Sequence, residues 1–308
     1  MCATAVQQGN CEMDPFLISV LSNIGLLSFL ALSAWILLIG GEISFGQQAY
    51  FALGAYGAGL ATAVWQLPLP LALIFGAGLG AAIGAAVAWP ASRLSGVHYA
   101  IATLAFAECL RAWLNMFHHQ RMVDGYLVGP DGPNGFRDIR WIFDHGVEPD
   151  AYLVLILGIL AVVLAGFALA GRMNLMAQLR MVGEDPILAG MQGLDVLRWK
   201  IGGAAVAGAI AALGGGLYAH MTTYVEPAQF SVMLGVHAVA YGLIGGLGTA
   251  LGPLLGVLVD IGLLESLRGL ASYRMIVFGA LVAVILILRP RGLLDEITVA
   301  KVRAWLRG

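Results

Sequence analysis

Long apolar stretches alternate with short polar segments along almost the whole chain. Each stretch is close to the length that a tilted helix needs to cross the hydrocarbon core of a bilayer, which takes about 20 apolar residues. The stretches cover residues 16–40, 45–65, 67–92, 96–117, 150–171, 200–223, 230–249, 252–270 and 273–289. The pattern predicts an all-α, polytopic transmembrane bundle of about nine spans.

Two polar segments, residues 118–149 and 172–199, interrupt this pattern. With the polar chain ends, they divide the sequence into an N-terminal tail over 1–15, a transmembrane domain over 16–295 and a C-terminal tail over 296–308. Aqueous partners are expected to act on the polar segments, because the apolar stretches are buried in lipid or in the bundle.

The basic residues predict the orientation, because lysine and arginine are retained on the cytoplasmic side of a membrane. If residues 172–199 and the C-terminal tail lie inside, ten of the sixteen basic residues are cytoplasmic. These ten are Arg93, Arg172, Arg180, Arg198, Lys200, Arg289, Arg291, Lys301, Arg303 and Arg307. The loop 118–149 holds five acidic and three basic residues and is expected outside. Nine spans then place the N-terminus outside.

Composition agrees with a membrane protein and argues against other classes. Hydrophobic residues make up 60% of the chain and charged residues 11%, whereas soluble domains carry about 25% charged residues. A net charge of -2 without a basic tail or stripe argues against a nucleic-acid partner. The first fifteen residues contain no lysine or arginine, so we expect no cleavable signal peptide.

The residues that usually carry catalysis or bind metals show no productive spacing. Cys2 and Cys11 can pair if the N-terminus lies outside, and Cys109 lies in an apolar stretch. The six histidines lack metal-binding spacing, and no nucleophile and base can be paired. A glycine-rich loop ending in Gly-Lys-Ser/Thr is also missing. We expect no catalytic residue, metal or cofactor in this chain.

Glycine is abundant, with 42 residues, and part of it recurs at helical spacing. Gly76, Gly80 and Gly84 are four residues apart, and a second group, including Gly202, Gly203, Gly208 and residues 214–216, lies in the sixth stretch. Membrane helices associate through close packing of small residues. These glycines are therefore predicted to form helix contacts.

The segment 183–193, GEDPILAGMQG, predicts a short cytoplasmic helix over 186–192. Asp185 suits the N-cap, Pro186 the first helical position and Gly193 the left-handed stop. Ile187, Leu188 and Met191 then form an apolar face, which marks either a partner site or a helix lying on the membrane surface.

Polar side chains in the apolar stretches are the candidates for a pathway, because ionisable groups at membrane depth are costly. A glycine-flanked break between the first two stretches favours pathway lining there, with helix–helix hydrogen bonds as the alternative. The candidates are Glu42, Gln47, Gln48, Tyr50, Phe51, Tyr99, Thr103, His237 and Tyr241. Glu108 with Arg111, and Glu265 with Arg268, are spaced to form ion pairs. Asp260 is expected to face the protein interior as a hydrogen-bond acceptor or a pathway group.

Several sequence blocks, in order, resemble one known family. Residues 41–56 read GEISFGQQAYFALGAY, residues 99–108 read YAIATLAFAE, and residues 245–253 read GGLGTALGP. With the coupling-like segment 183–193 and the RPRGL of residues 289–293, they resemble the permease subunits of ABC importers for branched-chain amino acids, urea and related solutes. The chain departs from the family at Gln47, where His is common, and at residues 235–237, where Ser-x-Glu is common.

This resemblance implies a set of partners and contact residues. A second permease, homologous but different, would complete the pathway, two cytoplasmic ATPase subunits would bind the coupling segment, and an external solute-binding protein would dock outside, all in a bacterial inner membrane. The implied ATPase contacts are Glu184, Asp185, Pro186, Ile187, Leu188, Ala189, Met191 and Gly193. The implied external docking residues are Gly129, Asp131, Gly132 and Asn134.

Other functions remain open at this point. Branched-chain amino acids lead among the solutes, followed by urea, short amides and aromatic acids. An ion-coupled secondary transporter would need Asp260, Glu265 or Glu108 to bind the coupling ion. A membrane-embedded enzyme would need a nucleophile and base, which we do not find.

Overall fold

The computed structural model describes residues 14–123, 126–266, 274–289 and 292–294. Nine of its helices correspond to the nine predicted stretches. They are α1 (Pro15–Ile39), α2 (Gln47–Ala63), α3 (Leu69–Ala91), α4 (Val97–Met116), α6 (Pro149–Arg172), α9 (Val196–Thr222), α10 (Val232–Gly245), α11 (Leu251–Ser266) and α12 (Arg274–Leu288). This confirms the all-α class. By length and composition, four of them, α1, α3, α6 and α9, are long and apolar enough to cross a membrane, and α10 to α12 contain shorter apolar helices.

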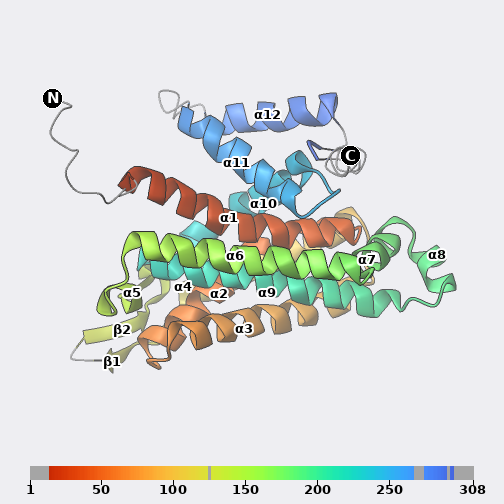
Figure 1. Cartoon of the computed structure of the whole chain (residues 1–308). Helices are drawn as coiled ribbons and strands as arrows, with labels where there is room; N and C mark the ends of the chain where they lie inside the picture. Colours follow the sequence, from red (N-terminus) through yellow and green to blue (C-terminus); the bar gives the residue numbers. More distant parts are fainter. Residues whose placement is uncertain (1–13, 124–125, 267–273, 290–291, 295–308) are drawn as a thin grey trace, which may run out of the picture.

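The remaining elements cap the two ends of the bundle (Figure 1). One end, here called the inner end, carries α7 (Leu175–Glu184) and α8 (Pro186–Met191). The opposite, outer end carries β1 (Arg121–Val123), β2 (Tyr126–Pro130), η1 (Gly132–Asn134), β3 (Phe136–Arg137) and α5 (Trp141–Asp144), with η2 (Pro227–Phe230) following α9. The strands form an antiparallel sheet in the order β1-β2-β3, which the all-α prediction did not include.

Two units of the sequence, α1 to α3 and α9 to α11, have the same arrangement of helices in opposite orientation. The long helix α1 is followed by a non-helical connection, the shorter α2, and then α3, which packs along α9. The long helix α9 is likewise followed by a non-helical connection, the shorter α10, and then α11, which packs along α1. In turn, α2 packs on α9 and α10 packs on α1. Because α1 ends at the inner end and α9 at the outer end, the two units form inverted repeats.

Helix α9 is the centre of the bundle and contacts α1, α2 and α3 (Figure 1). Its small residues allow backbone contact on two sides. A Cβ atom added to Gly208 would overlap the carbonyl of Gly80 on α3, and one added to Gly215 would overlap the carbonyl of Phe51 on α2. The predicted role of these glycines in helix packing is confirmed, whereas a Cβ on Gly202 would meet no atom within 4 Å.

The outer cap is tied to the end of α9 by backbone hydrogen bonds. The Phe136 amide donates to the Val225 carbonyl at 2.7 Å, and the Val225 amide donates to the Phe136 carbonyl at 3.0 Å. The Ile139 amide donates to the Thr223 carbonyl at 3.2 Å. Phe136 and Ile139 are fully buried below these bonds. The cap and the outer half of the bundle therefore share one core.

Candidate functional site

The coupling segment at the inner end consists of two helices, α7 and α8, joined at Asp185. The Asp185 carboxylate accepts hydrogen bonds from the amides of Ile187 and Leu188, both at 3.0 Å, and Pro186 is the first helical residue. Gly193 follows with a φ of +87°, the left-handed conformation that stops a helix. The predicted short helix is confirmed, one residue shorter than expected. Helix α7 was not predicted, although Leu179 and Val182 give it a buried apolar face.

Helix α8 turns its apolar side chains outward. Ile187 is 78% exposed, Met191 83% and Leu188 48%. Ala189, another of the implied ATPase contacts, is fully buried and does not belong to this exposed face. The other implied ATPase contacts, Glu184, Asp185, Pro186 and Gly193, are exposed. An uncovered apolar face on a short, capped helix is typical of a partner site.

Helix α7 is anchored to both inverted repeats at the inner end. Gly183 lies so close to Gly41 that a Cβ atom on either residue would overlap the other's backbone. Arg180 donates a hydrogen bond of 2.9 Å to the Leu247 carbonyl in the connection between α10 and α11. A displacement of α7 would therefore reach the connections of both repeats.

An ion pair fixes the first of these connections to α9. The Lys200 ammonium donates to the Glu42 carboxylate at 2.5 Å, and the two side chains are 15% and 6% exposed. Glu42 was expected to line the pathway and Lys200 only to mark the cytoplasmic side. The structure pairs them as a clamp between α9 and the connection that follows α1, and the role of Glu42 in a pathway stays a prediction.

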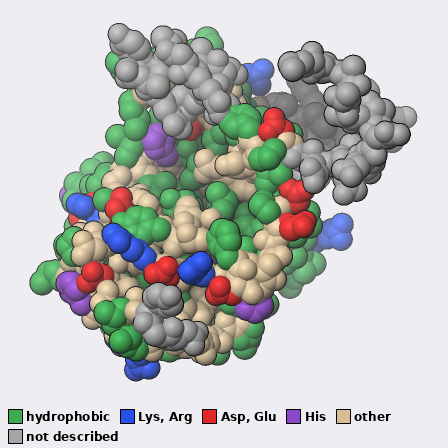
Figure 2. Space-filling model, turned by 90° about the vertical axis from the view of Figure 1, so that its left-hand side faces the viewer, with side chains coloured by type: hydrophobic (Ala, Val, Ile, Leu, Met, Phe, Trp, Pro, Cys, Tyr) green, Lys and Arg blue, Asp and Glu red, His purple; other side chains and the backbone are tan. Residues whose placement is uncertain are grey.

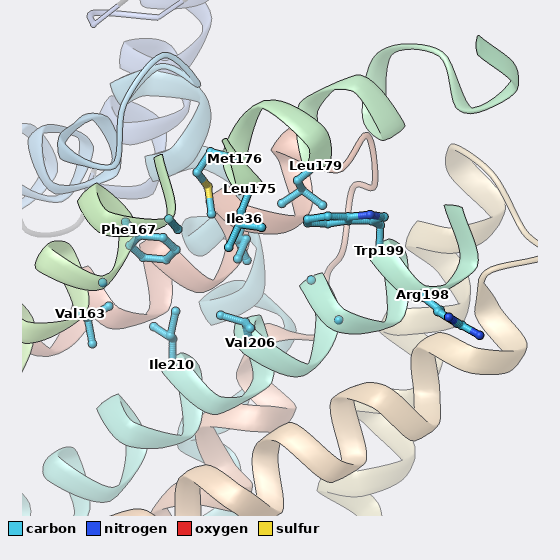
Figure 3. A pocket seen from close by; sticks show the side chains of 14 residues that line it. Ile36, Val163, Phe167, Leu175, Met176, Leu179, Arg198, Trp199, Val206 and Ile210 are labelled. Atoms are coloured by element: carbon cyan, nitrogen blue, oxygen red, sulfur yellow. The ribbon is translucent and has the colours of Figure 1, made fainter. Parts of the chain in front are cut away.

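An apolar pocket of about 590 Å³, open to the surface, lies between α6, α7 and α9 at the inner end. Figure 3 shows Leu175, Met176 and Leu179 of α7 facing it from one side, and Val206 and Ile210 of α9 from the other. Gly202 and Gly203 also line it: a Cβ atom on Gly202 would meet nothing within 4 Å, and one on Gly203 would make an ordinary contact of 3.5 Å with Leu179 of α7. Helix α7 is thus held to the bundle through Gly183 and Arg180, while its residues Leu175, Met176 and Leu179 border an open pocket.

The predicted break between the first two spans is a seven-residue connection, residues 40–46, that dips into the bundle. The Phe45 amide donates to the Thr103 hydroxyl at 3.2 Å, and the Ser33 hydroxyl donates to Gln47 Oε1 at 2.6 Å. Ser33 and Thr103 each lie six residues from the inner ends of their helices, about 9 Å at 1.5 Å per residue. Helix α2 therefore begins well inside the bundle.

Gln48 lies where the beginnings of α2 and α10 meet. A Cβ atom on Gly235 of α10 would overlap Gln48 Oε1, so this glycine makes room for the side chain. Gln48 is 1% exposed, and neither its Nε2 nor its Oε1 has a hydrogen-bond partner. Buried amides are usually satisfied. Among the described residues, this unsatisfied side-chain amide is the strongest support for the prediction that the candidate pathway residues contact a polar solute.

The aromatic members of the predicted set are packed in ring clusters. The ring centroid of Tyr50 lies 5.8 Å from that of Phe106. The ring centroid of Phe51 lies 5.6 Å from that of Tyr218 and 6.2 Å from that of Phe230. Tyr99 is buried on the same side of α4 as Thr103.

A second group of the predicted set joins α10 to its neighbours. The Tyr241 hydroxyl donates to the Asp260 carboxylate at 2.7 Å, which confirms Asp260 as an inward-facing acceptor. The His237 ring lies 4.4 Å from that of Phe278 on α12.

Most of the predicted pathway residues are buried within this one chain. Eight of the nine are less than 9% exposed, and only His237 is half-buried. The structure brings Gln47, Gln48, Phe51 and Thr103 together around the start of α2, and places His237 and Tyr241 with Asp260. Their role in a pathway stays a prediction.

The predicted ion pair on α4 is confirmed: Arg111 contacts the Glu108 carboxylate at 2.6 and 2.9 Å. Arg268, the predicted partner of Glu265, lies outside the described residues, and so do Cys2 and Cys11, which were expected to pair.

The predicted external docking residues organise the cap. Gly129 and Gly132 have positive φ, and they lie against the backbone of His119 and of Asn115, respectively. The side-chain amide of Asn134 donates to the Asp131 carboxylate at 2.9 Å. Of the four, Asn134 is exposed and Asp131 half-exposed, while both glycines are buried. Their role in docking is a prediction; their structural role is evident.

The outer face also carries mixed charge (Figure 2) and a polar cleft. The cleft, about 640 Å³, lies between the α2–α3 connection and the cap and includes Asp138, Arg140 and Asp144. Nearby, the Tyr224 hydroxyl donates to the Glu226 carboxylate at 2.9 Å, and this hydrogen bond raises the pKa of the phenol, so that it stays protonated. The sequence analysis did not single out these residues.

Comparison with known proteins identifies the family. The chain is similar to the high-affinity branched-chain amino acid transport system permease protein LivM of Salmonella typhimurium and of Escherichia coli, with 26% identity over 275 residues in each case. The match covers 83% of this chain and 64% of each relative, so the chain spans less than two thirds of their length. No solved structure shows a significant match.

The match to a family model extends over almost the whole membrane region. Residues 16–288 match the family described as "Branched-chain amino acid transport system / permease component". The predicted family and the multi-pass membrane character are confirmed. The chain belongs to the family of branched-chain amino acid transport permeases.

Proposed function

We propose that this chain is one permease subunit of an ATP-driven importer of branched-chain amino acids in a bacterial inner membrane. A second permease, homologous but different, completes the pathway, and two ATPase subunits bind the inner end. An external binding protein docks on the outer cap. The family and the relatives support the solute class, and the two ends of the molecule support the placement of the partners.

The exposed apolar face of α8 is the observation that carries the coupling role. Ile187 and Met191 project from a helix that is capped at Asp185 and followed by a left-handed stop. An amphipathic helix of this kind fits a groove of a partner protein. Because α7 contacts the connections of both repeats, a force on α8 would reach the start of α2 and the end of α10.

The pathway set remains part of this proposal. The starts of α2 and α10 meet at Gln48, and neither helix has a side-chain cap. In membrane transporters, the uncapped N-termini of interrupted helices bind anionic groups of the solute. Gln47 and Gln48 are therefore proposed to contact the solute when the repeats separate, with Glu42 and Thr103 holding the connection in place.

An uptake measurement tests the coupling role. The double variant Ile187→Asp/Met191→Asp, in the complex reconstituted into vesicles, is expected to lower ATP-driven leucine uptake at least tenfold and to release the ATPase subunits on purification. Its unfolding midpoint should not change, because both side chains are exposed. Met173→Asp, another exposed methionine near the inner end, serves as the control and should keep normal uptake.

Three outcomes would each contradict a part of the proposal. Normal uptake by the double variant would remove α8 from the coupling role. Uptake that ignores ATP depletion but collapses with a protonophore would favour the ion-coupled alternative. Binding of urea, a short amide or an aromatic acid, in place of leucine, by the associated external protein would change the solute assignment.

A further inference from the structure

Helix α4 has one face in the bundle and one face uncovered. Tyr99, Thr103, Ala107 and Leu114 are buried toward α2 and the outer cap. The uncovered face includes Val97, Ile101, Cys109, Trp113 and Met116. In a membrane, this second face must meet lipid, another protein or water.

The Glu108–Arg111 pair lies at the edge of this uncovered face, near the middle of the helix. Its two side chains are 33% and 37% exposed. Glu108 lies eleven residues beyond Val97 in a helix of 20 residues, about 16 Å along a length of about 30 Å. This length places Glu108 near the middle of α4, and near the middle of the hydrocarbon layer if α4 spans it from end to end.

Helix α6 has an exposed face without charged residues in the same chain. It is the most apolar of the four helices that are long enough to span, and it is mostly uncovered. Val154, Val162 and Leu169 lie on its exposed surface, and no charged residue occurs between Asp150 and Arg172. Helix α4 has 20 residues but is too polar to be counted with those four.

Charged side chains near the membrane centre are costly, and they usually face a bundle interior or a water-filled cavity. We propose that the uncovered face of α4 is a wall of the water-filled pathway between this chain and the second permease. This inference rests on the proposed function. It moves the pathway surface of α4 from Tyr99 and Thr103 to the opposite side of the helix.

The chemistry of this wall fits an α-amino acid. Glu108 offers a carboxylate to an ammonium group and Arg111 offers a guanidinium to a carboxylate, with the two groups 2.6 Å apart. Ile101, two helical turns before Glu108 on the same side of the helix, provides exposed apolar surface for an aliphatic side chain. A zwitterion with a branched side chain can exchange contacts with this pair as it passes, whereas urea carries neither charge.

The native Cys109 reports on this face, because it is exposed next to Glu108. The complete complex, carrying Cys2→Ser and Cys11→Ser in this chain, is placed in vesicles and treated with a membrane-impermeant, charged methanethiosulfonate. Mass spectrometry of this chain gives the labelling rate. The matched control is Val162→Cys in a Cys109→Ala background, on the exposed face of α6. Thiolates form in water and not in lipid.

Cys109 is expected to react at least tenfold faster than the cysteine of the control, and saturating leucine is expected to slow it. Equal rates would show that lipid or a dry helix contact covers the face, and would overturn the inference. Fast labelling that leucine does not alter would overturn the solute contact. ATP-driven uptake by the same vesicles is measured in parallel: uptake with slow labelling contradicts this inference alone, and absent uptake contradicts the proposed function.

Discussion

The middle and the inner end of α9 differ in how tightly they are packed. In the middle, Gly208 and Gly215 bring the helix into backbone contact with α3 and α2. At the inner end, Gly202 and Gly203 border a cavity of about 590 Å³ under α7 (Figure 3). Glycine thus allows close backbone contact in the middle of α9 and leaves open space at its inner end. We therefore expect the closely packed spans to move as bodies, and α7 to move with the two connections that it contacts.

The tight contact between α9 and α3 gives the largest expected effect. Gly80→Leu places a side chain where the backbone of Gly208 and the methyl group of Ala212 lie. Overpacking costs about 1–3 kcal/mol where side chains can yield. Here the two backbones must move apart, so we expect a larger loss of unfolding free energy than for any variant below. Yield of monodisperse protein and the thermal unfolding midpoint measure this.

A neighbouring glycine provides the control for that prediction. Gly78 lies on the same helix, but a Cβ atom there would meet nothing within 4 Å. Gly78→Leu should therefore keep the wild-type midpoint. If both variants unfold alike, the packing difference between the two faces of α3 is not what stabilises the bundle.

The second prediction concerns the clamp at the boundary between the two regions. Lys200→Met leaves the Glu42 carboxylate buried without its cation, and breaking such a pair costs about 3–5 kcal/mol. The added change Glu42→Gln removes the charge and should recover most of that loss. Denaturant unfolding of the single and double variants measures it.

A surface ion pair on the same helix separates burial from charge. Arg198 contacts Asp195 at 2.9 Å, but its side chain is 86% exposed. Arg198→Met should change the unfolding free energy by less than about 1 kcal/mol. A loss as large as that of Lys200→Met would mean that the clamp owes nothing to its buried position.

Some parts of this molecule could be predicted from sequence because their signals are local. The helix over 186–191 follows from an N-cap, a proline and a stop glycine within nine residues, and the spans follow from hydropathy over about 20 residues. The ion pair of Glu108 with Arg111 needs only one helical turn.

Other features depend on contacts between distant segments. The clamp joins Glu42 to Lys200, and the space for Gln48 is made by Gly235, so neither has a local pattern. The inverted repeats left a weak trace, an interrupted apolar stretch in each half of the sequence. The cap sheet consists of strands of two to five residues, too short for an alternating pattern to indicate them. The burial of most of the pathway set, likewise, depends on how α2, α4 and α10 pack.

The smallest effect is expected in the loosely packed region itself. Val206 borders the cavity on the α9 side (Figure 3), and Val206→Phe would fill part of the space beneath α7. Added apolar contact should raise the unfolding midpoint slightly, while ATP-driven uptake should fall two- to threefold because α7 loses room to shift. Val162→Phe, on the exposed face of α6 and away from the cavity, should change neither quantity. Uptake that is unchanged in a more stable Val206→Phe variant would mean that the cavity is a packing defect and that α7 moves together with α9.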